Sequence, residues 1–181
     1  MIDDDPLPFD SDPHLDSIWI DCYVRADPSP VLHRQIEHIR DRLRRLQETP
    51  VVADFQVKQW PPRQEIAVDT APTETTRDEI VASFEAWAEK NGYALTPAFQ
   101  RLTIPAEPGG SDGSGPRERL RVPQIALALY DDELGTGYLE AVVPYTDTTD
   151  DAKTYTVPRW LTEVEELARS QGLPTSETVQ G

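Results

Sequence analysis

The stretch SIWIDCYVRADPSPVLHRQIEHIRDRLRRLQ, residues 17–47, decides the fold class of this chain. Over residues 17–25 apolar residues alternate with more polar ones, the period-two pattern of a strand with one buried face. The segment Asp-Pro-Ser-Pro at 27–30 ends that strand, and Ser29 before a proline is typical of a helix start. The predicted helix carries one apolar stripe, formed by Leu32, Ile36, Ile39, Leu43 and Leu46. A strand that leads into an amphipathic helix predicts a mixed α and β fold.

Toward the middle of the chain the pattern continues with strands and a second helix. Residues 51–60 are predicted as a strand that ends at two prolines, and residues 65–68 as a short third strand. Thr76 with Glu79 three residues later is a capping box, and it begins a helix that ends at Asn91-Gly92. The spacing therefore predicts a second helix between two groups of strands.

The C-terminal half adds strands and a last helix. Residues 93–104 are predicted to be extended, and the apolar runs 122–130 and 138–145 predict an antiparallel hairpin. Thr156 is predicted to cap a final helix, whose inner stripe is Trp160, Leu161, Val164, Leu167 and Ala168. The first six elements match a ferredoxin-like βαββαβ unit, so we expect an α+β fold in which this unit is extended by a β-hairpin and a C-terminal helix.

Composition shifts divide the chain into a predicted domain and two tails. Residues 1–16 are an acidic, Pro-rich N-terminal tail, and residues 172–181 are a polar C-terminal tail, both predicted to be disordered. A single α+β domain is expected over residues 17–171. Within it, the Gly-, Ser- and Pro-rich residues 105–121 are predicted to be a flexible insertion.

The charge is strongly negative, with 33 acidic and 17 basic residues and a net charge of -16; only three of the basic residues are lysines. In molar salt the Debye length falls to about 3 Å, so dense carboxylates repel only near neighbours. Acidity with few lysines favours a halophilic protein over an acidic mesophilic one. Because no apolar run of about 18 residues and no signal peptide is present, we expect a cytoplasmic protein without membrane contact.

No recognised catalytic or metal-binding pattern occurs in the sequence. Cys22 is the only cysteine, which excludes an intrachain disulfide, and its strand period points it inward with Ile20 and Val24. His33 and His38 are five residues apart, which does not bring two metal ligands together on a helix. Since no phosphate loop or nucleophile elbow is present either, the sequence predicts no catalytic residues, no cofactor, no metal site and no enzymatic activity.

The first predicted helix is the one basic region of the acidic chain. Its candidate contact residues for phosphate or an acidic partner are Arg34, Arg40, Arg42, Arg44 and Arg45. The alternative is local pairing on a solvated face, because Glu37 is within reach of Arg40, and Asp41 is within reach of the arginines three and four residues later. Both interpretations stay open at this point.

Three segments together resemble a known family: IWIDCYVR at 18–25, DFQVKQW at 54–60 and FEAWA at 84–88. Over residues 17–170 the chain is similar to small acidic haloarchaeal proteins of unassigned function, some of them labelled helix-turn-helix domain proteins. The resemblance implies a haloarchaeal origin and allows a role as a transcription regulator. However, a helix-turn-helix motif joins two helices by a short turn, whereas strands separate the helices predicted here, and the insertion after Pro105 departs from shorter members.

Three functional hypotheses follow. The first is a non-enzymatic interaction or regulatory module with an unknown protein partner. The second is a DNA-associated transcription regulator that contacts phosphates through Arg40, Arg42, Arg44 and Arg45. The third is a small-molecule sensor or an enzyme with a pocket between the sheet and the last helix. The expected fold also allows a homodimer, formed through the first helix or through a sheet edge.

Overall fold

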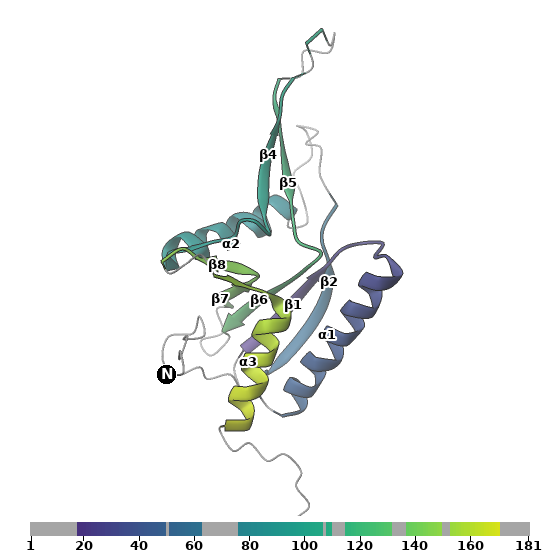
Figure 1. Ribbon diagram of the computed structural model, residues 1–181, viewed down its shortest axis with the longest axis vertical. Coiled ribbons are helices and arrows are strands. Elements are labelled where there is room, and N and C mark those ends of the chain that lie inside the picture. The colour runs from purple at the N-terminus through teal and green to yellow at the C-terminus, as the bar shows by residue number, and fades with distance from the viewer. Residues whose placement is uncertain are drawn as a thin grey trace, which may run out of the picture. The chain divides into compact units, whose positions relative to one another are not determined.

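The computed structural model describes residues 18–49, 51–62, 76–106, 108–109, 115–131, 137–149 and 153–170 (Figure 1). The chain divides into two compact units. Unit 1 is built from residues up to Trp60, residues 124–144 and residues from Thr154 onward, and unit 2 from residues 61–123 and 145–153. Unit 2 is therefore inserted in sequence between segments of unit 1.

Unit 1 contains a four-stranded sheet with the strand order β2-β1-β6-β7. Its strands are β1 (Ile18–Val24), β2 (Asp54–Gln59), β6 (Ile125–Asp131) and β7 (Tyr138–Val143). The central strand β1 pairs parallel to β2 and antiparallel to β6, and β6 pairs antiparallel to β7 with an irregularity after Leu129. β1 can occupy a central position in the sheet because nearly all of its residues suit a buried environment. Six of its seven residues are buried.

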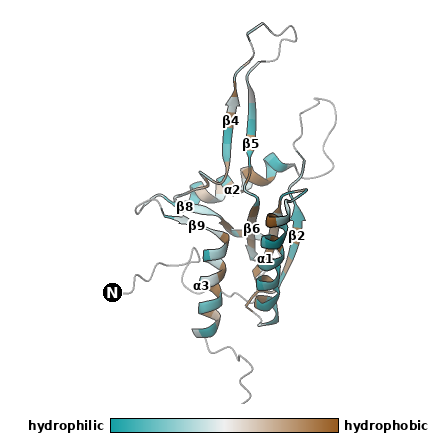
Figure 2. Ribbon diagram, turned by 45° about the vertical axis from the view of Figure 1, so that its right-hand side comes forward, coloured by the Kyte–Doolittle hydropathy of each residue, from teal (hydrophilic) through white to brown (hydrophobic). Residues whose placement is uncertain are grey.

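Helix α1 (Pro30–Glu48) connects the two parallel strands. The Ser29 side chain accepts a hydrogen bond from the Leu32 amide, and Pro30 opens the helix, as predicted. All five residues of the predicted stripe are buried, while the outward surface of α1 is polar (Figure 2). α1 contacts both β2 and α3, so its apolar stripe closes one side of the core of unit 1.

Helix α3 (Val157–Ser170) follows the short strand β9 (Thr154–Tyr155) and contacts β6 as well as α1. The Thr156 hydroxyl accepts a hydrogen bond from the Arg159 amide, so Thr156 caps the helix as predicted. Trp160, Leu161 and Val164 are fully buried, whereas Leu167 and Ala168 of the predicted stripe are half-buried. The first half of α3 is thus the part that is fixed in the core.

Unit 2 contains α2 (Arg77–Asn91) and the strands β3 (Tyr93–Ala94), β4 (Gln100–Ile104), β5 (Arg117–Arg121) and β8 (Tyr145–Asp147). The capping box of Thr76 and Glu79 is present, and Gly92 ends the helix with a φ of 75°, a left-handed conformation that suits glycine. β3 pairs antiparallel with β8, and β4 pairs antiparallel with β5.

An aromatic cluster forms the core of unit 2. Trp87 of α2 lies 5.5 Å from Tyr93 and 5.8 Å from Tyr145, measured between ring centroids. Phe84, one turn earlier on the helix, packs edge-on against Phe99 at 6.0 Å. These contacts hold α2 to the segments that follow it, because each ring buries a large apolar area.

The structure confirms the α+β class, the three predicted helix starts and the hairpin, which is β6–β7. The predicted strand 65–68 and the tails 1–16 and 172–181 lie outside the described residues. The ferredoxin-like detail, which needs that strand, and the single domain over 17–171 stay predictions.

Part of the predicted flexible insertion forms a β-strand, which the sequence interpretation did not include. Residues 117–121, inside the predicted insertion 105–121, form β5 and pair with β4 in register from Gln100 to Ile104. The physical reason is the alternation Arg-Glu-Arg-Leu-Arg, in which Leu120 is buried. This short strand was not predicted because the Gly- and Ser-rich run that precedes it is typical of a linker.

Candidate nucleic-acid interface

Two basic surfaces come from separate parts of the chain: the outward face of α1 and the β4–β5 hairpin. On α1, Arg40 forms an ion pair with Glu37 at 3.8 Å, and Arg44 forms one with Asp41 at 3.3 Å. Arg45 donates a hydrogen bond to the backbone carbonyl of Asp41. The local pairing that the sequence allowed is therefore present, and it reduces the positive charge that this face offers to a phosphate.

Arg42 is paired with residues of another helix, α3. Its Nε and Nη2 atoms donate to the two carboxylate oxygens of Glu165 at 2.8 and 2.9 Å, and Nη2 also donates to the Thr162 hydroxyl at 3.0 Å. These hydrogen bonds raise the pKa of Arg42 and lower that of Glu165. Arg42 thus connects α1 to α3 and is not available as a phosphate contact in this structure. No local pattern could indicate this contact, because Glu165 lies 123 residues away in the sequence.

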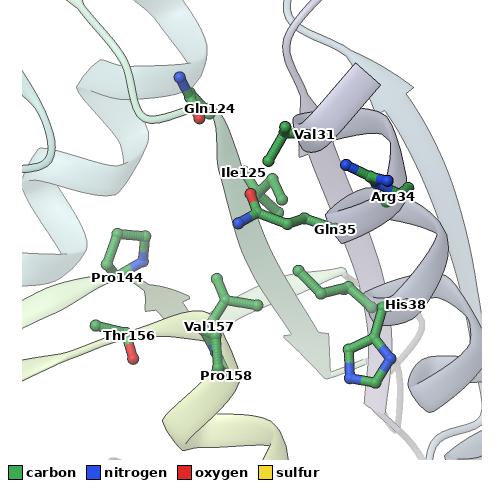
Figure 3. A pocket seen from close by; sticks show the side chains of 11 residues that line it. Val31, Arg34, Gln35, His38, Gln124, Ile125, Pro144, Thr156, Val157 and Pro158 are labelled. Atoms are coloured by element: carbon green, nitrogen blue, oxygen red, sulfur yellow. The ribbon is translucent and has the colours of Figure 1, made fainter. Parts of the chain in front are cut away.

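Arg34 lies apart from the other arginines, in the first half of α1. It lines a pocket together with Gln35 and His38 of the same helix (Figure 3). Within the described part of the chain, no hydrogen bond or ion pair is formed by its side chain. The five predicted contact residues consequently do not form one continuous surface: three are paired locally on the outward face, one joins two helices and one lines a pocket.

The β4–β5 hairpin is held against α2 by one of its two faces. Residues paired across the strands share a face, and Arg101, Thr103, Glu118 and Leu120 are on the same one. Arg101 donates to both carboxylate oxygens of Glu85 at 2.9 and 3.0 Å and to Asp78 at 3.3 Å, both on α2. The hydrogen bonds to Glu85 raise the pKa of Arg101. Arg101 is therefore the anchor of the hairpin on α2.

The opposite face of the hairpin carries a second set of arginines, which sequence analysis did not single out. The register places Leu102 opposite Arg119 and Gln100 opposite Arg121, on the same face as Ile104. Leu102 and Ile104 are each 43% exposed, and both arginines are exposed. Neither Arg119 nor Arg121 has an ion pair among the residues that the structure describes. The alternating arginines at 117, 119 and 121 were the available sequence signal.

Such a surface has the chemistry of a nucleic-acid contact. A two-stranded antiparallel ribbon fits the major groove of B-DNA, and arginines without an acidic partner donate to phosphate oxygens or guanine edges. The exposed aliphatic side chains can contact thymine methyl groups. We name the residues Leu102, Ile104, Arg119 and Arg121 the ribbon face.

The one buried carboxylate described in the sheet of unit 1 is fully paired. Asp21 accepts hydrogen bonds from the side-chain amide of Gln56 at 2.8 Å and from the Lys58 ammonium at 2.9 Å. At the next residue of β1, burial raises the pKa of the Cys22 thiol to about 12, and the charge of Asp21 adds to that rise. Cys22 is buried as predicted, and at neutral pH its thiol stays protonated.

The part of the chain that the structure describes contains no group of three His, Cys, Asp or Glu side chains placed to hold a metal ion. None of its helices is long and apolar enough to cross a membrane.

Comparison with known proteins identifies a matching family model. Neither the curated proteins nor the solved structures include one that matches this chain. A family model described as a helix-turn-helix domain matches residues 12–169, which is most of the chain. Among the described residues, strands separate the three helices, so the motif with a short turn is not seen there. The extent of the match nevertheless shows that this chain belongs to the helix-turn-helix domain family.

Proposed function

We propose that this protein is a non-enzymatic regulatory module that binds DNA, and that the ribbon face is its main DNA contact. The observation that carries the proposal is the pair of exposed arginines, Arg119 and Arg121, on the face of the hairpin that does not pack on α2. Membership of the helix-turn-helix domain family supports DNA as the partner.

The contrast with α1 supports the choice of surface. Arg40 and Arg44 have acidic partners within one helical turn, so binding a phosphate there would compete with an existing ion pair. Arg119 and Arg121 would lose no such pair within the described residues. A phosphate contact at the ribbon face therefore replaces only water, which makes it the more favourable of the two basic surfaces.

The net charge of -16 opposes DNA binding at long range. We propose that the protein works at high ionic strength, in a halophilic cell, where repulsion between its carboxylates and DNA phosphates is confined to about 3 Å. Screening weakens the attraction of arginine for phosphate as well. Short-range hydrogen bonds from the ribbon face must then supply most of the affinity.

The test is DNA binding by fluorescence anisotropy, with a pool of random-sequence duplexes of about 30 base pairs, sized to about three turns of B-DNA. The variant Arg119→Glu/Arg121→Glu is compared with the matched control Arg40→Glu/Arg44→Glu on α1, at several KCl concentrations. We expect the ribbon variant to bind at least about tenfold more weakly, and the slope of log K against log salt to become shallower by about 2, because two phosphate contacts are lost.

The control variant separates the two surfaces. If Arg40→Glu/Arg44→Glu loses binding and the ribbon variant keeps it, α1 is the DNA contact and the ribbon assignment is wrong. If the wild-type protein binds none of the duplexes at any salt concentration, the DNA proposal is wrong. The exposed Leu102 and Ile104 would then favour the alternative of a protein partner, as an exposed aliphatic pair is typical of such a contact.

A further inference from the structure

A pocket of about 530 Å³ lies within unit 1, between the first half of α1, the start of β6 and the first turn of α3 (Figure 3). This volume falls in the range of cavities that bind small molecules. The apolar part of its wall includes Val31 and Ile39 of α1, Ile125 of β6 and Val157 of α3, together with two prolines. Val31 is 58% exposed, which is a high exposure for an aliphatic residue and leaves apolar surface in contact with water.

Five polar residues line the pocket, and three of them come from one helix; the other two are Gln124 and Thr156. Arg34, Gln35 and His38 line it from α1, and Figure 3 shows Gln35 extending from the helix toward Ile125. None of the three forms a side-chain hydrogen bond or an ion pair with another residue that the structure describes. Donor groups that have no partner among the described residues are therefore present at the edge of an apolar pocket.

The charge of the pocket is opposite to that of the chain. Acidic residues outnumber basic ones by 33 to 17, yet among the described residues no carboxylate lines the pocket, and Arg34 supplies the one permanent charge found there. Val31 and Val157 lie in the first turns of α1 and α3, and neither of these first turns contains an acidic residue. The two helix dipoles consequently add positive potential at the same place. This combination favours an anionic group on the ligand.

We propose that this pocket binds a small organic acid, a molecule with an apolar body and one carboxylate. The apolar body would lie against Val31, Ile125 and Val157, and the carboxylate would accept hydrogen bonds from the Arg34 guanidinium. Gln35 and His38 would contribute further donors. The inference is independent of DNA binding, because it concerns unit 1 alone and its test contains no nucleic acid.

The experiment is isothermal titration calorimetry of the full chain with matched pairs of probes: 2-naphthoate with 2-naphthamide, and indole-3-acetate with indole-3-acetamide. Each pair has the same shape and differs in charge. We expect at least one carboxylate to bind and its amide to bind at least about tenfold more weakly. No binding by either carboxylate, or equal binding of a carboxylate and its amide, would overturn the proposal.

Three variants locate the site. Arg34→Gln removes the charge of the pocket and is expected to weaken carboxylate binding about tenfold. Arg40→Gln, on the same helix but outside the pocket and paired with Glu37, is the matched control and should bind as the wild type does. Val31→Trp places a large ring over the apolar wall from an exposed position, so it should block binding without unfolding the chain. Equal affinity of Arg34→Gln and wild type would place the ligand elsewhere.

Discussion

Arg42 on α1 and Glu165 on α3 are joined by two parallel hydrogen bonds of 2.8 and 2.9 Å, so one ion pair connects the two helices of unit 1. The side chains of Arg42 and Glu165 are only 12% and 25% exposed. We expect Arg42→Gln to lower the free energy of unfolding by about 2 kcal/mol, because a largely buried carboxylate loses its charged donors. Chemical denaturation of wild type and variant measures the difference.

The control for that change is Arg44→Gln, which breaks the ion pair with Asp41 on the exposed face of α1. Both side chains of that pair are more than half exposed, so we expect a loss of at most about 0.5 kcal/mol. Equal losses for the two variants would show that the Arg42–Glu165 pair has no special role in stability.

The same pair predicts a dependence of stability on pH. Arg42 lowers the pKa of Glu165 below its ordinary value of 4.5. Glu165 therefore stabilises the folded state above that value, and this contribution is lost as the pH falls through the lowered pKa. We expect the difference in unfolding free energy between wild type and Glu165→Gln to be constant near neutral pH and to shrink below about pH 4.5. A difference that stays constant down to pH 3 would contradict the assignment.

How far the sequence predicts this fold depends on how local each signal is. The Ser29 cap, the capping box at Thr76 and the buried stripe of α1 are set by neighbours within a few residues, and all are present in the structure. The pairing of β1 with both β2 and β6 has no local signal, because a strand pattern shows which face is buried and does not show the neighbouring strand.

In the candidate sites, too, contacts between neighbours in the sequence could be predicted, and contacts between distant segments could not. Pairing of Arg40 with Glu37 was predictable from spacing on one helix, whereas the pairing of Arg42 with Glu165 required the packing of α1 on α3. The ribbon face was missed because a strand of five residues follows a Gly-Ser run that is typical of linkers. The pocket combines residues from four separate segments of the chain, and no sequence pattern brings these together.

Arg101 is expected to control how firmly the β4–β5 hairpin is attached to α2. Replacing it with Gln removes the hydrogen bonds to Glu85 and Asp78. We expect amide hydrogen exchange in β4 and β5 to become about fivefold faster, equivalent to about 1 kcal/mol of local stability. The amides of α2 beyond its cap serve as the internal reference. Unchanged exchange in both strands would mean that Arg101 is not the anchor.

Cys22 is expected to be unreactive in the folded protein. Burial raises the pKa of its thiol to about 12, so the reactive thiolate is nearly absent at pH 8. We expect alkylation by iodoacetamide at pH 8, followed by mass spectrometry, to be at least a hundredfold slower in the native protein than in the same protein unfolded by guanidinium chloride. A native rate close to the unfolded rate would indicate an accessible thiol and would reopen a nucleophilic role.

The position of unit 2 in the sequence has a consequence for synthesis of the protein on the ribosome. β1 meets β2 soon after it is made, but its partner on the other side, β6, begins at Ile125, about a hundred residues later. At typical elongation rates that delay lasts on the order of 5–20 s. Throughout it, a strand that has six of its seven residues buried in the folded protein lacks the final partner for one row of backbone donors and acceptors. The nascent chain is therefore most prone to wrong strand pairing while unit 2 is being translated, and ribosome-bound chains that end between residues 61 and 123 are the ones expected to recruit chaperones.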